Sequence, residues 1–231
     1  MSIYELVEED IASVYVRWAD RGAEYFERSR SEYERVVDPA AYYRQAPDMS
    51  ELEAVNLSYT EWFLFEFGIR GGKSPVECYV DDPPSDATRA QLGRLRQVAD
   101  TQFFSRFGIE GKRRDEGDVE LVDLMGGGGY VAHVPVACHR RSWRTGSLAV
   151  RIARVDGHWM QVGGMLLYDR SPSRRAAGAG PGEFHEDVGV ELGPDGWSLT
   201  ERERSESYYL NFLHDVMGLG GAFTDTFRCV A

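Results

Sequence analysis

The spacing of apolar residues gives the first part of the chain a helical period and the following part an alternating one. Between Ile3 and about Val37, apolar side chains recur at intervals of three and four residues, with acidic residues and arginines between them. This spacing places the apolar side chains on one face of a helix. It predicts one long amphipathic helix, or two helices that meet near Gly22. The pair Asp38-Pro39 should end this region, because proline keeps the preceding residue out of helical geometry.

Three further helices are predicted before residue 103. Ser50 and the glutamate three residues later form a capping box, which opens a helix leading into the aromatic cluster at residues 62–67. Ser74, which a proline follows, starts a short helical turn. Asp86 is the expected N-cap of another helix that runs to about Thr101. The aromatic cluster has helical spacing, so we interpret it as core.

After residue 103 the pattern changes to strict alternation, which is typical of strands with one buried face. The glycines at 126 to 129 form the loop of one hairpin, and Asp156-Gly157 is a two-residue turn in a second. Five consecutive short strands at this spacing favour a small antiparallel barrel or a strongly bent sheet. The predicted strands are 104–109, 119–124, 130–136, 148–155 and 159–168.

The predicted fold class is α+β, with a helical N-terminal half, a small five-stranded antiparallel barrel or bent sheet, and a C-terminal helix. Residues 1–102 form the helical region and residues 103–170 the barrel or sheet. Residues 171–187 are rich in Ser, Pro, Ala and Gly, which is typical of an exposed linker. Residues 188–231 contain one helix, opened by a second capping box at Thr200. We expect these parts to pack as one globular unit.

Composition excludes several classes of protein. With 42% hydrophobic residues in 231, the chain has enough apolar mass for a core, yet no apolar run approaches the roughly 20 residues that span a bilayer. The first ten residues are acidic and do not resemble a secretory signal, so we expect a cytoplasmic protein without a membrane partner. The three cysteines lie far apart without a C-x-x-C pair, so neither a disulfide framework nor a cysteine zinc site is predicted. No cofactor or metal is expected.

Charge is segregated along the chain, and this is the strongest indication of function. The net charge is −12, yet five arginines and no carboxylate lie between Gly126 and Val155. Guanidinium groups bind phosphate or carboxylate through paired hydrogen bonds, and a tryptophan among them can stack on a planar group. The candidate binding residues are Arg140, Arg141, Trp143, Arg144 and Arg154.

These residues suggest a non-enzymatic binding module for an acidic protein partner or an anionic small molecule. The sequence pI of about 4.9 disfavours nucleic acid, because phosphate repulsion opposes approach except at a local basic face. If strand alternation holds, Arg151 points to the opposite face from Arg154. The alternative to a binding surface is that the arginines form ion pairs with the acidic residues of the N-terminal helix.

An enzyme is the second hypothesis. His133 or His139 would act as a base near the glycine loop, with Asp123 to orient it, and Cys138 would supply an activated thiolate or a metal ligand. However, no third ligand stands at motif spacing. The glycine loop also lacks the lysine and Ser/Thr of a phosphate-binding loop and is not followed by a helix, so we interpret it as a hairpin loop.

An oligomeric assembly subunit is the third hypothesis. Either terminal helix could pair with a copy of itself. An exposed apolar stripe that includes Tyr208, Phe212 and Met217 would favour this homo-oligomer.

Three segments of the chain resemble known sequences: EWFLF at 61–65, VELVDL at 119–124 with its glycine turn, and GSLAVRI at 146–152 followed by Asp156-Gly157. Over about residues 55–168 the chain is similar to uncharacterised bacterial proteins, some of which carry a C-terminal SEC-C zinc motif. Here the cysteine-rich tail is absent and Cys229 is the only C-terminal cysteine, so no metal ligand is carried over. The resemblance implies an arrangement of the fold and no activity.

Overall fold

The computed structural model of the chain describes all residues except 22, 126, 170–207, 220–226 and 230–231. It divides into two compact units, and each is considered by itself. The helical unit comprises Met1–Asp100 and Tyr209–Phe223, and the barrel unit comprises Thr101–Tyr208 and Thr224–Ala231. The predicted linker at 171–187 and the predicted cap at Thr200 lie outside the described residues.

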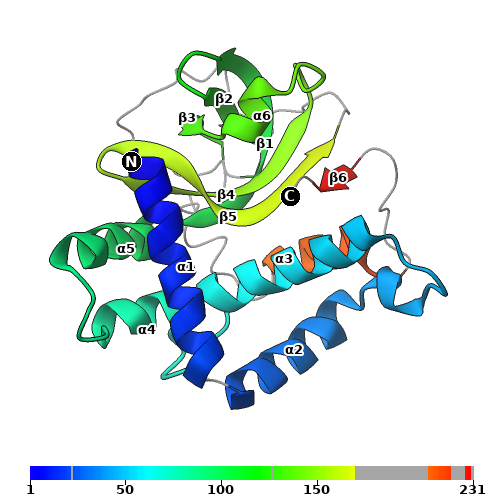
Figure 1. Cartoon of the computed structure of the whole chain (residues 1–231). Coiled ribbons are helices and arrows are strands. Elements are labelled where there is room, and N and C mark those ends of the chain that lie inside the picture. Colours follow the sequence, from blue (N-terminus) through cyan, green and yellow to red (C-terminus); the bar gives the residue numbers. More distant parts are fainter. Residues whose placement is uncertain (22, 126, 170–207, 220–226, 230–231) are drawn as a thin grey trace. The chain divides into compact units, whose positions relative to one another are not determined.

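Helices make up the first unit (Figure 1). Of the two alternatives predicted for this region, the structure has two helices and not one long helix, and a 3-10 helix follows Asp38-Pro39. None of the helices in the described parts of the chain is long and apolar enough to cross a membrane. In order, the elements are α1 (Ile3–Arg21), α2 (Ala23–Val37), η1 (Ala40–Tyr43), α3 (Met49–Phe65), α4 (Pro75–Asp81), α5 (Arg89–Thr101) and, after the second unit, α8 (Tyr208–Met217).

Two of the predicted helix caps are wrong by two residues. The cap of α3 is Asp48 instead of Ser50, because the Asp48 carboxylate accepts a hydrogen bond from the backbone N–H of Ser50 at 3.0 Å. Helix α5 starts after Thr88, whose hydroxyl accepts from the N–H of Gln91 at 3.1 Å, and Asp86 lies two residues upstream. In both cases a side-chain oxygen satisfies a free N–H of the first turn.

Helix α4 begins where the sequence predicts. Ser74 and Glu77 form a complete capping box, in which each side chain accepts from the backbone N–H of the other residue, at 3.4 and 2.8 Å. Pro75 occupies the first turn, where its missing N–H leaves no bond unmade.

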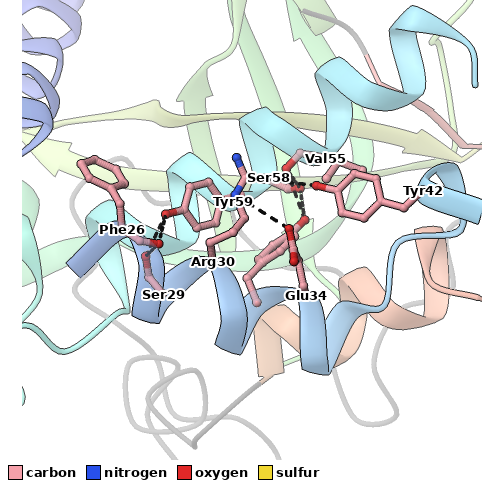
Figure 2. Close-up of polar contacts among 9 residues, drawn as sticks. Phe26, Ser29, Arg30, Glu34, Tyr42, Val55, Ser58 and Tyr59 are labelled. Carbon is pink, nitrogen blue, oxygen red and sulfur yellow. Dashed lines mark hydrogen bonds and ion pairs between the residues drawn. The ribbon is translucent and has the colours of Figure 1, made fainter. Parts of the chain in front are cut away.

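The core of the helical unit is aromatic and contains a buried hydroxyl network. Tyr33 and Ser58 share a hydrogen bond of 2.6 Å, and Tyr59 shares one of 2.8 Å with Ser29 (Figure 2). The interpretation of residues 62–67 as core is confirmed for its aromatic members, all of which are buried. Helix α8 joins this core through Tyr209, Leu210, Leu213, Val216 and Met217.

The second unit is a ring of strands, confirming the α+β class. Its sheet order is β3-β2-β1-β4-β5-β6, and an additional β3–β5 pairing closes the first five strands into a ring. The strands are β1 (Phe103–Arg113), β2 (Asp118–Asp123), β3 (Gly129–His133), β4 (Ser147–Val155), β5 (His158–Asp169) and β6 (Phe227–Cys229).

The ring is mixed, which corrects the prediction of a purely antiparallel barrel. The closing pair is parallel, with Ala132 opposite Trp159 and His133 opposite Met160. After β3 the chain crosses to β4 on the far side of β1, and β5 then reverses direction and arrives beside β3 running the same way. The alternation of apolar residues in a strand indicates which face is buried, but not whether the neighbouring strand runs parallel or antiparallel. The sequence therefore did not reveal the parallel β3–β5 pair.

The segment predicted as a strand over 130–136 ends earlier than expected. Strand β3 stops at His133, and Pro135 opens the short helix α6 (Pro135–His139). Proline cannot donate to a strand ladder, but it fits the first turn of a helix. Helix α6 packs against β2 (Figure 1) and leads into the loop that carries the candidate arginines.

Candidate anion-binding surface

Residues 140–146, here called the basic loop, connect α6 to β4. Arg140, Arg141 and Arg144 are exposed. Among the described residues, no carboxylate lies within ion-pairing distance of any of these three arginines. By contrast, Arg106 pairs with Asp169 at 3.0 Å in the same unit. The basic loop thus presents three guanidinium groups that no carboxylate of the described chain neutralises, although that of Arg140 lies 5.3 Å from the ring centroid of Trp143.

Trp143 anchors the basic loop to the barrel. Its ring is 3% exposed and stacks on Tyr168 with centroids 4.5 Å apart and planes at 11°. The Tyr168 hydroxyl donates to the carbonyl oxygen of Thr145 at 2.6 Å, and the N–H of Ile109 donates to that of Gly146 at 3.0 Å. Trp143 is therefore unavailable to stack on a ligand, which corrects the role expected for it. Stacking and hydrogen bonding instead fix the loop backbone from which the arginines project.

Gly146 is required where the loop enters β4. Its φ is +117°, and a Cβ there would lie 2.3 Å from the carbonyl oxygen of Asp169. Only glycine adopts this backbone without a clash. The close approach holds the end of the loop against β5.

Lys112 supports the other end of the basic loop. Its ammonium donates to the carbonyl oxygens of Ala137 and Arg140, the latter at 3.0 Å. These carbonyls belong to the end of α6, where free acceptors favour a cation. Burial lowers the pKa of Lys112, and the nearby charge of Arg114 acts in the same direction.

The sequence interpretation missed this second basic segment. Lys112, Arg113 and Arg114 are consecutive in the β1–β2 hairpin, and the contact of Lys112 with Arg140 brings the hairpin beside the basic loop. Arg113 pairs with Glu120 at 3.1 Å, while Arg114 is exposed. The run of three cations was visible in the sequence, but its proximity to the loop depends on strand pairing.

Arg154 does not belong to the same surface. It lies at the far end of β4, where its guanidinium contacts the carbonyl oxygen of Gly157 at 3.4 Å. It is seven positions from Ser147, a distance of about 23 Å along a strand. The structure therefore does not bring Arg154 together with the other candidate arginines.

Arg151 is buried, but its strand neighbours Val150 and Ile152 belong to the core cluster of the barrel and Arg151 does not. It is 2% exposed, donates to Gln102 at 2.5 Å and lies 5.9 Å from the ring centroid of Phe104. A buried guanidinium needs such partners to offset its lost hydration. Arg151 is a structural residue of the barrel.

The structure does not bring Asp123 beside His133, as the enzyme hypothesis requires. Asp123 accepts from the Ser105 hydroxyl at 2.6 Å and from the N–H of Met125 at 2.8 Å. Asp118 begins β2 and stands opposite His133 in the β2–β3 register, whereas Asp123 is the last residue of β2. The two ends of the strand are about 17 Å apart. The expectation that Asp123 orients His133 is therefore wrong.

His133 contacts the carboxylate of Asp118 instead of that of Asp123. Its Nδ1 lies 2.9 Å from the Asp118 carboxylate, while the Nδ1–H of His139 donates to the carbonyl oxygen of Pro135 at 2.8 Å. The Cys138 thiol donates to the backbone carbonyl of Asp118 at 3.2 Å. Burial raises the pKa of the Cys138 thiol, although Lys112 and Arg114 act against it, and a raised pKa disfavours the thiolate form that a nucleophile requires.

No group of three or more potential metal ligands gathers in the described parts of the chain. Gly127 and Gly128 connect β2 to β3 with φ values of +79° and +92° and stand before a strand, as expected of a hairpin loop. The exposed stripe of the oligomer hypothesis is not present as expected, since Met217 is 5% exposed and packs within the helical unit.

No protein-family model matches the chain, and no curated protein or solved structure matches it either. The resemblance to uncharacterised bacterial proteins therefore stays a prediction. The function has to be argued from the residues themselves.

Proposed function

We propose that this protein is a non-enzymatic binding module that holds an anionic ligand or an acidic partner on the basic loop. The observation that carries the proposal is the set of Arg140, Arg141 and Arg144. These three side chains are exposed within five positions of one another, without a carboxylate partner in the described chain. Like charges placed close together repel one another, and an anion offsets this repulsion while accepting paired hydrogen bonds.

The fixed backbone of the loop adds to the argument. Trp143, Lys112 and Gly146 hold the loop at its middle and at both ends. A binding surface that is already ordered loses less conformational entropy when its ligand arrives. Arg114 extends the positive charge from the neighbouring hairpin.

The barrel gives a weaker, fold-level argument. The five strands of the ring follow the order found in Greek-key barrels of the OB type. Barrels of that type bind oligonucleotides and oligosaccharides through strands and loops. The same arrangement serves many unrelated functions, so the proposal rests on the arginines. An oligonucleotide is nevertheless a useful probe in the experiment.

Fluorescence anisotropy with labelled polyglutamate, a labelled oligothymidylate and a labelled nucleotide tests the proposal at low and moderate salt. We expect salt-sensitive binding of at least one probe, and the probe identifies the kind of anion. In the double variant Arg141→Ala/Arg144→Ala, the loss of two charge-assisted contacts should weaken binding by about tenfold or more.

The matched control is Arg89→Ala/Arg96→Ala, which removes the same charge from exposed positions on α5. This control should change the affinity little, because its effect is confined to long-range electrostatics. Equal weakening in the two double variants, or unchanged binding in the loop variant, would contradict the proposal. Circular dichroism of each variant checks that the fold is retained.

A further inference from the structure

The exposed face of α6 is apolar and lies next to the basic loop. Pro135 and Val136 are exposed on this helix, Val136 to 40%. All other exposed large hydrophobic side chains of the described chain belong to the helical unit. The backbone N–H of Arg140 donates to the carbonyl oxygen of Val136 at 3.3 Å, so the valine stands one helical turn before the first arginine of the loop. The surface therefore changes from apolar to basic over about 6 Å, the rise of four helical residues.

The aromatic side chains of the barrel offer no platform for stacking. Between Thr101 and Asp169, every aromatic side chain is at most 3% exposed. Proteins that bind single-stranded nucleic acid hold successive bases on exposed aromatic rings, and these contacts supply much of the affinity. In this part of the chain, the surface around the basic loop has arginines for anionic groups but no ring for bases.

The charge of the whole protein acts against a long polyanion. The formal net charge is −12, although the basic loop itself is positive. A nucleic-acid duplex extends beyond the loop and is repelled by the acidic remainder, whereas a short acidic segment contacts the loop alone. The distribution of charge thus favours a short acidic segment.

We infer that the partner of the basic loop is a protein segment in which acidic residues flank an apolar side chain. This inference rests on the proposed function of the loop and adds an apolar contact to it. Arg141 and Arg144 pair with carboxylates, while the apolar side chain packs on Val136. In an extended segment, alternate residues lie on one face about 6.7 Å apart, which is close to the rise from Val136 to Arg140.

Fluorescence anisotropy of the whole chain with two labelled peptides tests the inference. One peptide is Glu-Ser-Glu-Ser-Leu-Ser-Glu-Ser-Glu, whose symmetric pattern presents a glutamate two residues from the leucine in either chain direction. The other has serine in place of leucine, and both have blocked termini, so their charges are equal. We expect the leucine peptide to bind about tenfold more tightly. Pentathymidylate, which has as many phosphates as each peptide has glutamates, and a short DNA duplex should bind more weakly than the leucine peptide.

Val136→Ser should remove the advantage of the leucine peptide and leave the affinity of the serine peptide unchanged. A purely structural role of Val136 would instead weaken both peptides alike. The matched control is Val16→Ser, which changes a valine that is 57% exposed on α1 and should alter neither affinity. Arg141→Ala/Arg144→Ala should weaken both peptides, because both use the carboxylate contacts.

The outcomes separate this inference from the proposed function. Equal affinity of the two peptides for the unmodified chain would overturn the inference, while weakening of both by the arginine variant would still support the proposed function. Tighter binding of pentathymidylate or of the duplex than of the leucine peptide would overturn the inference in favour of nucleic acid. If no anionic probe binds, the inference and the proposed function fail together.

Discussion

Arg141 and Arg151 carry the same guanidinium group but lie in opposite surroundings. Arg141 is exposed on the basic loop, whereas Arg151 is buried against Gln102 and Phe104. The guanidinium of Arg141 is available to a ligand, whereas that of Arg151 is already engaged by Gln102 and Phe104. Trp143 shows the same dependence, because burial on Tyr168 turns a candidate stacking surface into an anchor.

Tyr33 gives a testable prediction at the residue scale. Burial raises its pKa well above the ordinary value of 10.0, so the folded protein holds the phenol proton to higher pH than the unfolded chain. The unfolded state binds fewer protons above about pH 10, and stability therefore falls as pH rises from there toward the folded-state pKa. Tyr33→Phe should reduce the steepness of this fall, while lowering stability at neutral pH by about 1 kcal/mol through the lost hydrogen bond.

Urea unfolding from neutral to alkaline pH measures both effects. Burial also raises the pKa of Tyr59, so part of the alkaline loss should remain in Tyr33→Phe. Tyr15→Phe is the control, because Tyr15 is 39% exposed. A pH profile of Tyr33→Phe that runs parallel to that of the wild type would refute the explanation.

At the scale of elements, tight turns decide how strands meet. Gly117 lies in the β1–β2 hairpin with a φ of +82°, and a Cβ there would lie 2.6 Å from Cε1 of His133. Its carbonyl oxygen accepts from the N–H of Val134, directly after β3. The turn thus closes against the end of β3 as well as joining β1 to β2.

Gly117→Ala should destabilise the protein more than Gly157→Ala. Both positions have positive φ, at +82° and +85°, so both substitutions pay a similar backbone strain of about 1 kcal/mol. Gly157 has open space where a Cβ would be, whereas at Gly117 the ring of His133, held by Asp118, must move. Thermal unfolding of the two variants measures the difference, and equal losses would rule out the clash.

At the scale of the whole molecule, the helical unit is completed by a segment from the far end of the chain. The hydroxyl of Tyr209 on α8 donates to the carbonyl oxygen of Ser58 at 3.4 Å, and His214 Nδ1 lies 3.2 Å from the carbonyl oxygen of Val37. Leu213, between them, is fully buried. Formation of this unit therefore requires contacts of very long sequence separation.

Leu213→Ala should destabilise the helical unit by about 2–5 kcal/mol, the usual result of a large-to-small change in a core. Hydrogen exchange should accelerate in peptides from α2 and α3, which contact α8, and change less in β1 and β4. Asn211→Ala is the matched control, since Asn211 is exposed on the same helix. Equal acceleration across both units would show that α8 stabilises the chain as a whole.

Most elements of the fold could be predicted because their signals are local. Helical spacing, the capping box at Ser74 and the Asp156-Gly157 turn each act within a few residues. The errors occurred where two short polar residues near a helix start could each serve as the cap, as at Asp48 and Thr88. A further error occurred where a proline ended β3. The predicted and observed caps differ by only two residues, a difference that periodicity does not resolve.

The candidate site was predictable only in part. The exposed arginines could be named, since their clustering is a property of the sequence. The support from Lys112 and the pairing of His133 with Asp118 could not, because both follow from the β1–β2 and β2–β3 registers. A register joins residues that are distant in sequence, and no window of the chain encodes it.

The sequence by itself determined the helical first half, the five-strand second half and the concentration of arginines before and within β4. These follow from periodicity, turn chemistry and composition, which act over short stretches of chain. Only the tertiary structure decided that β3 and β5 close the ring in parallel, that Trp143 is buried and Arg141 exposed, and that α8 completes the helical core. The physical reason is that closure and burial depend on contacts between residues far apart in the chain, whose free energy is gained only when the whole unit forms.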